Sequence, residues 1–300
     1  MKKVVFVILI IVMVFSIIGC TSSNSVTSTN PPDLEQGTPD TKPDATTPPG
    51  DSSSANLIIF NGTSMEAGDG VIVNGNVATV TTAGTYQVSG KLNDGQLCVD
   101  ADNCDVYIIF DNAEIHCSNS APFFVKKANH VYLTLAEGSV NTLTDGSNYA
   151  LEAGITEPDA TLFSKADMTI SGAGNLNVTS NYNDGIANRD TLVIESGNIN
   201  VDAVNHGIKG KDFLSIINGN IKVVAGLDGI KSTQDTDSSL GYVVISGGNI
   251  EINAQDEAVS AVTSVKITGG NLNIDTANNG VKAGTTVEIS GGKVVISTDD

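Results

Sequence analysis

The stretch LVIESGNINVDAVNHGIKGKD, residues 192–212, is one unit of a repeat that decides the fold. Copies of its first half begin at Met168, Leu192, Leu214, Val243, Val265 and Val287, at intervals of 24, 22, 29, 22 and 22 residues. Each copy alternates apolar and polar residues in two short runs around a bend that contains Gly, which is the pattern of half-buried strands. A period of this length without a helical pattern predicts an all-β fold, a parallel β-helix with turns of about 22 residues.

The alternation assigns each position of the unit to one side of the sheet. The positions predicted to point inward are Leu192, Ile194, Ile199, Val201 and Ile208. Those predicted to point outward are Val193, Glu195, Asn200, Asp202 and Lys209. Because the next unit has the same pattern, we expect like residues to stack in columns along the solenoid, about 4.8 Å apart.

The N-terminal residues predict export. Lys2 and Lys3 precede an apolar run, and Ile17-Ile18-Gly19-Cys20 resembles a bacterial lipobox. We expect residues 1–19 to be a lipoprotein signal peptide, cleaved before Cys20, with a lipid on that thiol as the protein's link to the membrane and an extracellular location. An ordinary signal peptide with an incidental Cys is the alternative. The Ser/Thr/Pro-rich residues 20–55 predict a disordered tether, and residues 56–300 predict one β-helix domain.

The repeat also predicts a further turn beyond Asp300, so we expect the sequence to be incomplete at that end.

The composition excludes one class of partner. The formal charge is −19, from 15 basic and 34 acidic residues, and loss of Lys2 and Lys3 with the signal would make it −21. Nucleic-acid binding by charge neutralisation is excluded, because the basic excess that it needs is absent. Cys98, Cys104 and Cys117 lack a metal-type spacing and are expected to be free thiols, with a Cys98–Cys104 disulfide as the alternative.

Two columns of side chains stand out. The first comprises Asn175, Asn198, Asn220, Asn249 and Asn271 and ends at Lys293, and we expect it to be a structural hydrogen-bonded ladder. The second lies in the tight turns Asp184-Gly185, His206-Gly207, Asp228-Gly229, Glu257-Ala258 and Asn279-Gly280. Part of this second signal is explained by the positive φ that Asp-Gly and Asn-Gly turns favour.

The charged residues around these turns predict a site in two parts. Because Ca²⁺ takes six to eight oxygen ligands, the candidate metal ligands are Asp184, Asp202, Asn205, Asp228, Asp256 and Glu257. The candidate substrate-binding cations are Arg189, Lys209, Lys211, Lys231 and Lys282. The alternative is a solvated face on which these charges neutralise one another. The loops 147–158 and 234–241 are expected to lie beside the turns and to shape the binding face.

Four stretches resemble a known family: YQVSGKLNDGQLCVDA (86–101), FFVKKANHVYLTLAEGSVNTLTDGS (123–147), LFSKADMTISGAGNLNVTSNYNDGI (162–186) and HGIKGKDFLSIINGN (206–220). They look like the carbohydrate-binding domain-containing lipoproteins on the surface of clostridia. The resemblance implies a right-handed parallel β-helix similar to pectate lyases, with bound calcium and with affinity for polygalacturonate and cellulose. The matching positions are the Asp184 turn, residues 206–212, and the Asp228 turn with Lys231. The chain departs from the family's Asp-Asp-Gly at residues 205–206, 256–258 and 278–279.

These observations favour a calcium-dependent, surface-anchored protein that binds acidic plant polysaccharide, in which Ca²⁺ bridges protein and sugar carboxylates. Crystalline cellulose is less favoured, because stacking on sugars needs aromatics and the chain has no Trp and six Tyr. The first alternative is a pectate lyase, in which Ca²⁺ acidifies the sugar C5 proton and Lys209 or Lys231 removes it. The second alternative is a structural adhesin that only displays a stiff surface. Whether the protein is an enzyme, and its oligomeric state, stay open.

Overall fold

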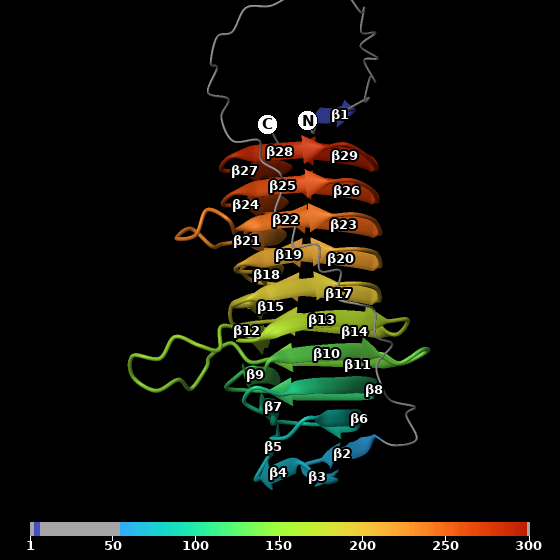
Figure 1. The fold of residues 1–300 in the computed structure, drawn as a ribbon, viewed down its shortest axis with the longest axis vertical. Helices are drawn as coiled ribbons and strands as arrows, with labels where there is room; N and C mark the ends of the chain where they lie inside the picture. Colours follow the sequence, from blue (N-terminus) through green and yellow to red (C-terminus); the bar gives the residue numbers. More distant parts are fainter. Residues whose placement is uncertain (1–2, 7–54, 299–300) are drawn as a thin grey trace, which may run out of the picture. The chain divides into compact units, whose positions relative to one another are not determined.

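A computed structural model describes residues 3–6 and 55–298 of the chain (Figure 1). Cys20 and most of the expected signal peptide and tether lie outside the described residues. The chain divides into two compact units, and all the described strands belong to the unit made of residues 1–6 and 50–300. Among the described residues, no helix is long and apolar enough to cross a membrane.

Two sheets contain every described strand. The 19-stranded sheet consists of β1 (Lys3–Phe6), β2 (Asn56–Gly62), β3 (Ser64–Ala67), β6 (Gly84–Leu92), β8 (Asp105–Cys117), β10 (His130–Leu135), β11 (Val140–Asp145), β13 (Asp167–Gly172), β14 (Asn175–Ser180), β16 (Thr191–Ile194), β17 (Asn198–Ala203), β19 (Phe213–Ile216), β20 (Asn220–Ala225), β22 (Tyr242–Ile245), β23 (Asn249–Ala254), β25 (Ser264–Ile267), β26 (Asn271–Thr276), β28 (Thr286–Ile289) and β29 (Lys293–Thr298). The 10-stranded sheet consists of β4 (Val71–Asn74), β5 (Val77–Val80), β7 (Gln96–Asp100), β9 (Phe123–Lys127), β12 (Ala160–Ser164), β15 (Asp184–Asn188), β18 (Ile208–Gly210), β21 (Ile230–Ser232), β24 (Val259–Ala261) and β27 (Val281–Ala283).

The strands stack in three parallel ladders, and each repeat adds one strand to each ladder (Figure 1). The first ladder contains β15, β18 and β21, the second β16, β19 and β22, and the third β17, β20 and β23. Leu192 pairs with Leu214 and Leu214 with Val243, so equivalent residues of the repeat lie side by side. β8 pairs with both β10 and β11 and thereby joins the second and third ladders into one sheet. The fold is all-β with long parallel sheets, which is consistent with a parallel β-helix.

The antiparallel pairings of the described strands are β1 with β29, β2 with β3 and β4 with β5. β1 falls in the expected signal peptide, so the mature chain that cleavage would produce lacks this strand.

Cys98, Cys104 and Cys117 are free, as predicted, and Cys98 and Cys117 are buried.

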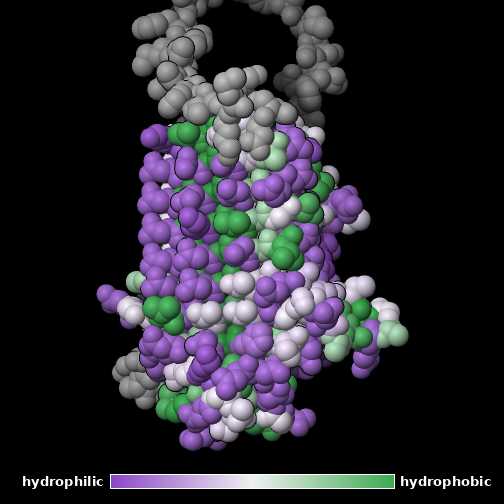
Figure 2. Space-filling view, turned by 180° about the vertical axis from the view of Figure 1, so that it is seen from behind, coloured by the Kyte–Doolittle hydropathy of each residue, from purple (hydrophilic) through white to green (hydrophobic). Residues whose placement is uncertain are grey.

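The core confirms the inward assignment. Leu192, Ile194, Ile199, Val201 and Ile208 are each at most 2% exposed, and they belong to one apolar cluster that extends through the stack. Figure 2 shows hydrophilic side chains repeated along the outer surface of the stack, with apolar patches between them. Two of the residues predicted to point outward are nonetheless covered, since Val193 is 9% exposed and Lys209 is 7% exposed, although neither belongs to the main core cluster.

The Asn column forms the predicted side-chain ladder from Asn198 to Asn271, whereas Asn175 donates to the Ser139 carbonyl instead. Asn220 donates from Nδ2 to Oδ1 of Asn198 at 2.8 Å, and Asn249 and Asn271 each repeat this hydrogen bond to the preceding rung at 3.0 Å. The column therefore links rungs through side chains as well as through the backbone ladder. Lys293 pairs in register with Asn271 at its end, as predicted.

Positive φ occurs at a different bend from the predicted one. It occurs just before the Asn column, at Gly197, Gly219, Gly248, Gly270 and Gly292, with φ between 80° and 121°. The glycines of the Asp-Gly turns lie outside this region and are needed for close packing instead. At Gly229 a Cβ would lie 2.4 Å from Cγ2 of Ile252 and 2.7 Å from the carbonyl oxygen of Ala258.

Candidate functional site

The candidate site lies on the outer face of the first ladder. Register places its outward side chains in one column, which comprises Phe124, Phe163, Ala187, Lys209, Lys231, Ser260 and Lys282. The first three belong to a small apolar cluster outside the main core, against which Tyr149 packs. Tyr149 lies in the segment between β11 and β12, and its hydroxyl donates to Asp145 Oδ2 at 2.7 Å. This segment, which contains the predicted loop 147–158, therefore covers one part of the face and leaves the rest open.

The turn residues beside this column each bind the backbone of the next rung. Oδ1 of Asp184 accepts the N–H of His206 at 3.1 Å, Nδ1 of His206 accepts that of Asp228 at 3.2 Å, and Oδ1 of Asp228 accepts that of Glu257 at 3.1 Å. Burial lowers the pKa of His206, and the nearby Asp184 and Asp228 carboxylates only partly oppose this. A neutral ring with its proton on Nε2 fits the acceptor role of Nδ1. These turn side chains thus have a structural role in the stack.

Lys209 is enclosed rather than offered to a ligand. Its ammonium donates to the fully buried Asp184 carboxylate and lies 3.5 Å from Oδ2 of Asp159. Asn205 donates to the same Asp184 carboxylate at 2.9 Å. The prediction of Lys209 as an outward sugar-binding group or base is therefore wrong in its exposure, because Asp159 and Asp184 close over it. Asp184 is likewise 0% exposed, so its predicted role as a ligand requires these contacts to be broken.

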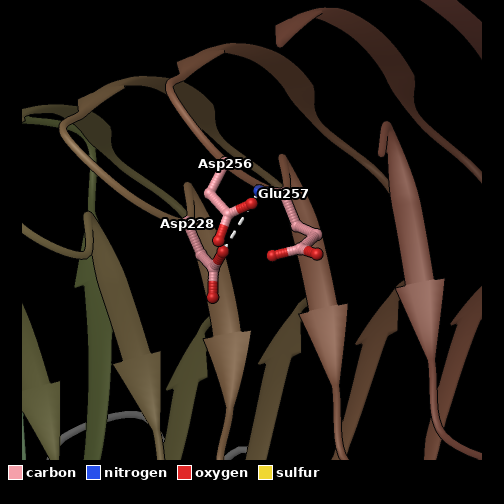
Figure 3. Close-up of side chains that lie close together, drawn as sticks. All are labelled: Asp228, Asp256 and Glu257. Atoms are coloured by element: carbon pink, nitrogen blue, oxygen red, sulfur yellow. Dashed lines mark hydrogen bonds between the residues drawn. The ribbon is translucent and has the colours of Figure 1, made fainter. Parts of the chain in front are cut away.

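Three of the predicted metal ligands do come together on the open part of the face. One ligating oxygen each from Asp228, Asp256 and Glu257 lie within 4.8 Å of one another (Figure 3). The Nζ of Lys231 lies 2.5 Å from Asp228 Oδ2, and that of Lys282 lies 2.5 Å from Glu257 Oε1. We call these five residues the acid–lysine cluster. It borders a groove of about 240 Å³ whose floor includes Ser260 and Ala261.

The pKa values of the two acids that pair with lysines are shifted in opposite directions. Burial raises the pKa of Glu257, and the Asp228 carboxylate adds to this, although Lys282 opposes it. Burial also acts to raise the pKa of Asp228, but hydrogen bonds from Lys231 and from Glu257 outweigh it and hold this pKa below its usual value. Glu257 in turn raises the pKa of Lys282. Asp228 and Glu257 are thus each paired with an ammonium group, which a hard cation would have to displace to take their oxygens as ligands.

The other predicted residues lie elsewhere. Asp202 is exposed on β17 in the third ladder, in register with Thr179 and Val224, and so lies apart from the turns. Arg189 and Lys211 follow β15 and β18 and form a neighbouring column, not the column of Lys231 and Lys282. Arg189 lies 2.6 Å from Glu157 Oε1 through Nε and 2.8 Å from Asp159 Oδ2 through Nη2.

Sequence reasoning missed Glu157, Asp159 and Ser260. Glu157 and Asp159 fall at the end of an insertion with no repeat period, so no register predicts which cations they reach. Ser260 donates from Oγ to Asp228 Oδ2 at 3.1 Å. The sequence does place Ser260 in the column of Lys209 and Lys231, and a polar residue at that position was a signal for a contact with the turn acids. The second predicted loop, 234–241, follows β21, where Figure 1 shows it projecting from the stack.

Comparison with known proteins agrees with this fold. The profile of the carbohydrate-binding domain-containing protein family matches residues 74–300. The chain belongs to this family. A carbohydrate-binding domain-containing protein from Acetivibrio thermocellus is 37% identical over 150 residues, which are 49% of this chain and 52% of the relative, so the match spans about half of that relative's length.

A solved structure gives the same result at the level of the fold. It is described as the polysaccharide lyase-like protein from C. thermocellum, as a gadolinium derivative. It is 36% identical to this chain, with a TM-score of 0.77, and the match covers 80% of this chain and 100% of the solved one. Carbohydrate binding is thereby supported at a coarse level.

Proposed function

We propose that this member of the family binds acidic polysaccharide, such as polygalacturonate or pectin, in a calcium-dependent manner on the cell surface. The observation that carries the proposal is the acid–lysine cluster, which unites three carboxylates and two ammonium groups beside an open groove. We also propose that the β-helix is right-handed, as the family resemblance implies. The repeat further predicts turns of about 22 residues, and the lipobox-like residues predict a lipid on Cys20 that anchors the protein outside the cell.

The donor set fits Ca²⁺. Asp228, Asp256 and Glu257 supply hard carboxylate oxygens, each able to bind through one or two atoms, and sugar carboxylates and water would complete a shell of six to eight. Ca²⁺ would supply the positive charge that lets so acidic a protein hold a polyanion.

Displacement of the two lysines by Ca²⁺ would couple metal binding to sugar binding. Lys231 and Lys282 now neutralise two of the three carboxylates. If Ca²⁺ takes those oxygens, both ammonium groups lose their partners next to the groove, and each can donate charge-assisted hydrogen bonds to a sugar carboxylate. The same exchange explains why binding would require calcium, because without it the lysines stay paired with the protein's own acids.

Calorimetric titration with Ca²⁺ tests the proposal. We expect a dissociation constant of roughly 10⁻⁴ to 10⁻³ M, as in other extracellular modules. Asp256→Asn should weaken binding of Ca²⁺ and retention on polygalacturonate, and a chelator should reduce the retention of the wild type to that of the variant. Asp202→Asn is the matched control, since it removes the same charge from another ladder. Equal effects of the two variants, or retention unchanged by the chelator, would contradict the proposal.

A lyase is the second candidate, favoured by the likeness to the polysaccharide lyase-like structure. Of the two predicted bases, Lys209 is enclosed, whereas Lys231 borders the groove. Catalysis would therefore use Lys231 to remove the C5 proton of a uronate. Incubation with polygalacturonate and calcium would then produce unsaturated uronide absorbance that Lys231→Ala abolishes and Lys209→Met does not. A flat absorbance trace would leave binding as the function.

A further inference from the structure

A second row of cations runs along the first ladder, within β9 and directly after β12, β15 and β18. Val125 pairs with Ser164, Ser164 with Asn188, and Asn188 with Gly210. The residues that follow these four are all basic and occupy consecutive rungs: Lys126, Lys165, Arg189 and Lys211. We call them the basic column. Because adjacent strands lie about 4.8 Å apart, the column spans roughly 15 Å.

The structure shows that this column holds carboxylates. Glu157 inserts its carboxylate between two consecutive members, with Oε2 2.9 Å from Nζ of Lys165 and Oε1 2.6 Å from Nε of Arg189. Asp159 adds a second carboxylate at Arg189. Neighbouring rungs therefore lie at the correct separation for one carboxylate to contact two cations. Both acids come from the segment between β11 and β12, which is not part of the repeat.

Aromatic rings support two of the cations. Nζ of Lys126 lies 5.7 Å from the ring centre of Phe124, and Cζ of Arg189 lies 5.5 Å from that of Phe163. The two contacts differ in geometry, because Lys126 lies over a ring of its own strand, whereas Arg189 lies over the ring of the preceding rung. A cation held over a ring keeps its charge at the surface with fewer accessible rotamers, which lowers the entropy lost when it binds an anion.

The two ends of the column are open. Within residues 55–298, neither Lys126 nor Lys211 forms an ion pair, whereas Lys165 and Arg189 are paired with Glu157. Lys126 is exposed and Lys211 is half-buried. Two nearby acids are engaged with other groups, since Asp212 accepts a hydrogen bond from Gln234 at 2.8 Å and Asp167 accepts one from the Thr191 amide at 3.1 Å. Asp190 directly follows Arg189 and is a further acid beside the column.

We propose that the basic column is a second, calcium-independent subsite for the carboxylates of an acidic polysaccharide, and that Glu157 occupies it as an internal competitor. The ligand class rests on the proposed function, whereas the subsite rests on the register and on Glu157. A polyuronate carries one carboxylate on every sugar, and a column of cations at regular spacing can contact several in succession. Charge-assisted hydrogen bonds from Arg and Lys recognise these groups without a metal.

The test is the affinity for an oligogalacturonate, measured by calorimetry or fluorescence anisotropy at low salt in the presence of a chelator. The double variant Lys126→Met/Lys211→Met should weaken this binding roughly threefold or more, as loss of two exposed charge pairs implies. Glu157→Gln should strengthen it, because Lys165 loses its internal partner and Arg189 keeps only Asp159. Lys222→Met is the control: Lys222 is also an exposed lysine, but it pairs with Glu251 in the third ladder.

The outcomes separate the two proposals. Chelator-resistant binding that follows these variants supports the basic column, even if the Ca²⁺ titration at Asp256 fails. Complete loss of binding in chelator, or no response to the double variant and to Glu157→Gln, overturns the basic column and leaves the calcium proposal intact. An equal effect of Lys222→Met, or equal retention of a DNA oligomer of the same charge, would also overturn it, because either shows diffuse attraction in place of a site.

Discussion

Replacement of Asp184 should destabilise the fold far more than it changes ligand binding. The Asp184 carboxylate is fully buried and accepts hydrogen bonds from Lys209, Asn205 and the His206 amide. Loss of one partner of a buried ion pair costs about 3–5 kcal/mol, because the other charge stays buried without compensation. Asp159, 3.5 Å from the Lys209 ammonium, compensates only in part. We therefore expect Asp184→Ala to lower the free energy of unfolding by about 3 kcal/mol or more.

Urea unfolding of a double-mutant cycle measures this effect. Asp184→Asn and Lys209→Met should each destabilise the protein, and their combination should recover most of the loss, since no uncompensated charge remains. The exposed pair Lys222–Glu251, 3.0 Å apart, is the control and should contribute less than about 1 kcal/mol. An Asp184 variant with the stability of the wild type, but without polygalacturonate binding, would refute the reasoning and restore Asp184 as a ligand.

Three further predictions concern the stack. His206 has a lowered pKa, so its contribution to stability is present above its usual pKa of 6.5 and is lost as the pH falls through the lower folded value. His206→Asn keeps an acceptor for the Asp228 amide but removes the titrating group. In urea unfolding measured at several pH values, this variant should therefore show a smaller loss of stability in that pH range. Asn220→Ala breaks two ladder hydrogen bonds and should cost about 1 kcal/mol in thermal or urea unfolding, with an unchanged midpoint contradicting the ladder's role. Gly229→Ala places a Cβ against Ile252 and should cost about 1–3 kcal/mol; a neutral effect would show that the rung can shift.

The repeat allowed much of the fold to be predicted. A period of two within each run identified the buried Leu192 and Ile199, and the 22-residue interval aligned the Asn column, because a strand register follows directly from an apolar pattern. Positive φ was predicted at the wrong bend. An Asp-Gly pair is typical of a turn with positive φ, but glycine also occurs where close packing leaves no room for a Cβ. Gly229 is an example of the second cause.

The site was harder to predict because it depends on how ladders are oriented and on residues outside the repeat. Alternation shows that Asp202 points outward, but not that its ladder faces away from the turns. Lys209 carries the same pattern as Lys231, yet Asp159, brought by a non-repeating segment, covers only Lys209. The cluster of Asp228 with Asp256 and Glu257 was accessible to sequence reasoning because all three residues lie in adjacent turns of the repeat.

An anomalous difference map from crystals of the protein soaked in a lanthanide such as terbium tests the central claim most directly. The account predicts a peak bonded to carboxylate oxygens of Asp228, Asp256 and Glu257, with the ammonium groups of Lys231 and Lys282 displaced from the carboxylates that they now contact. A map without a peak at this position, or with the two lysines still paired to Asp228 and Glu257 at full metal occupancy elsewhere, would contradict it.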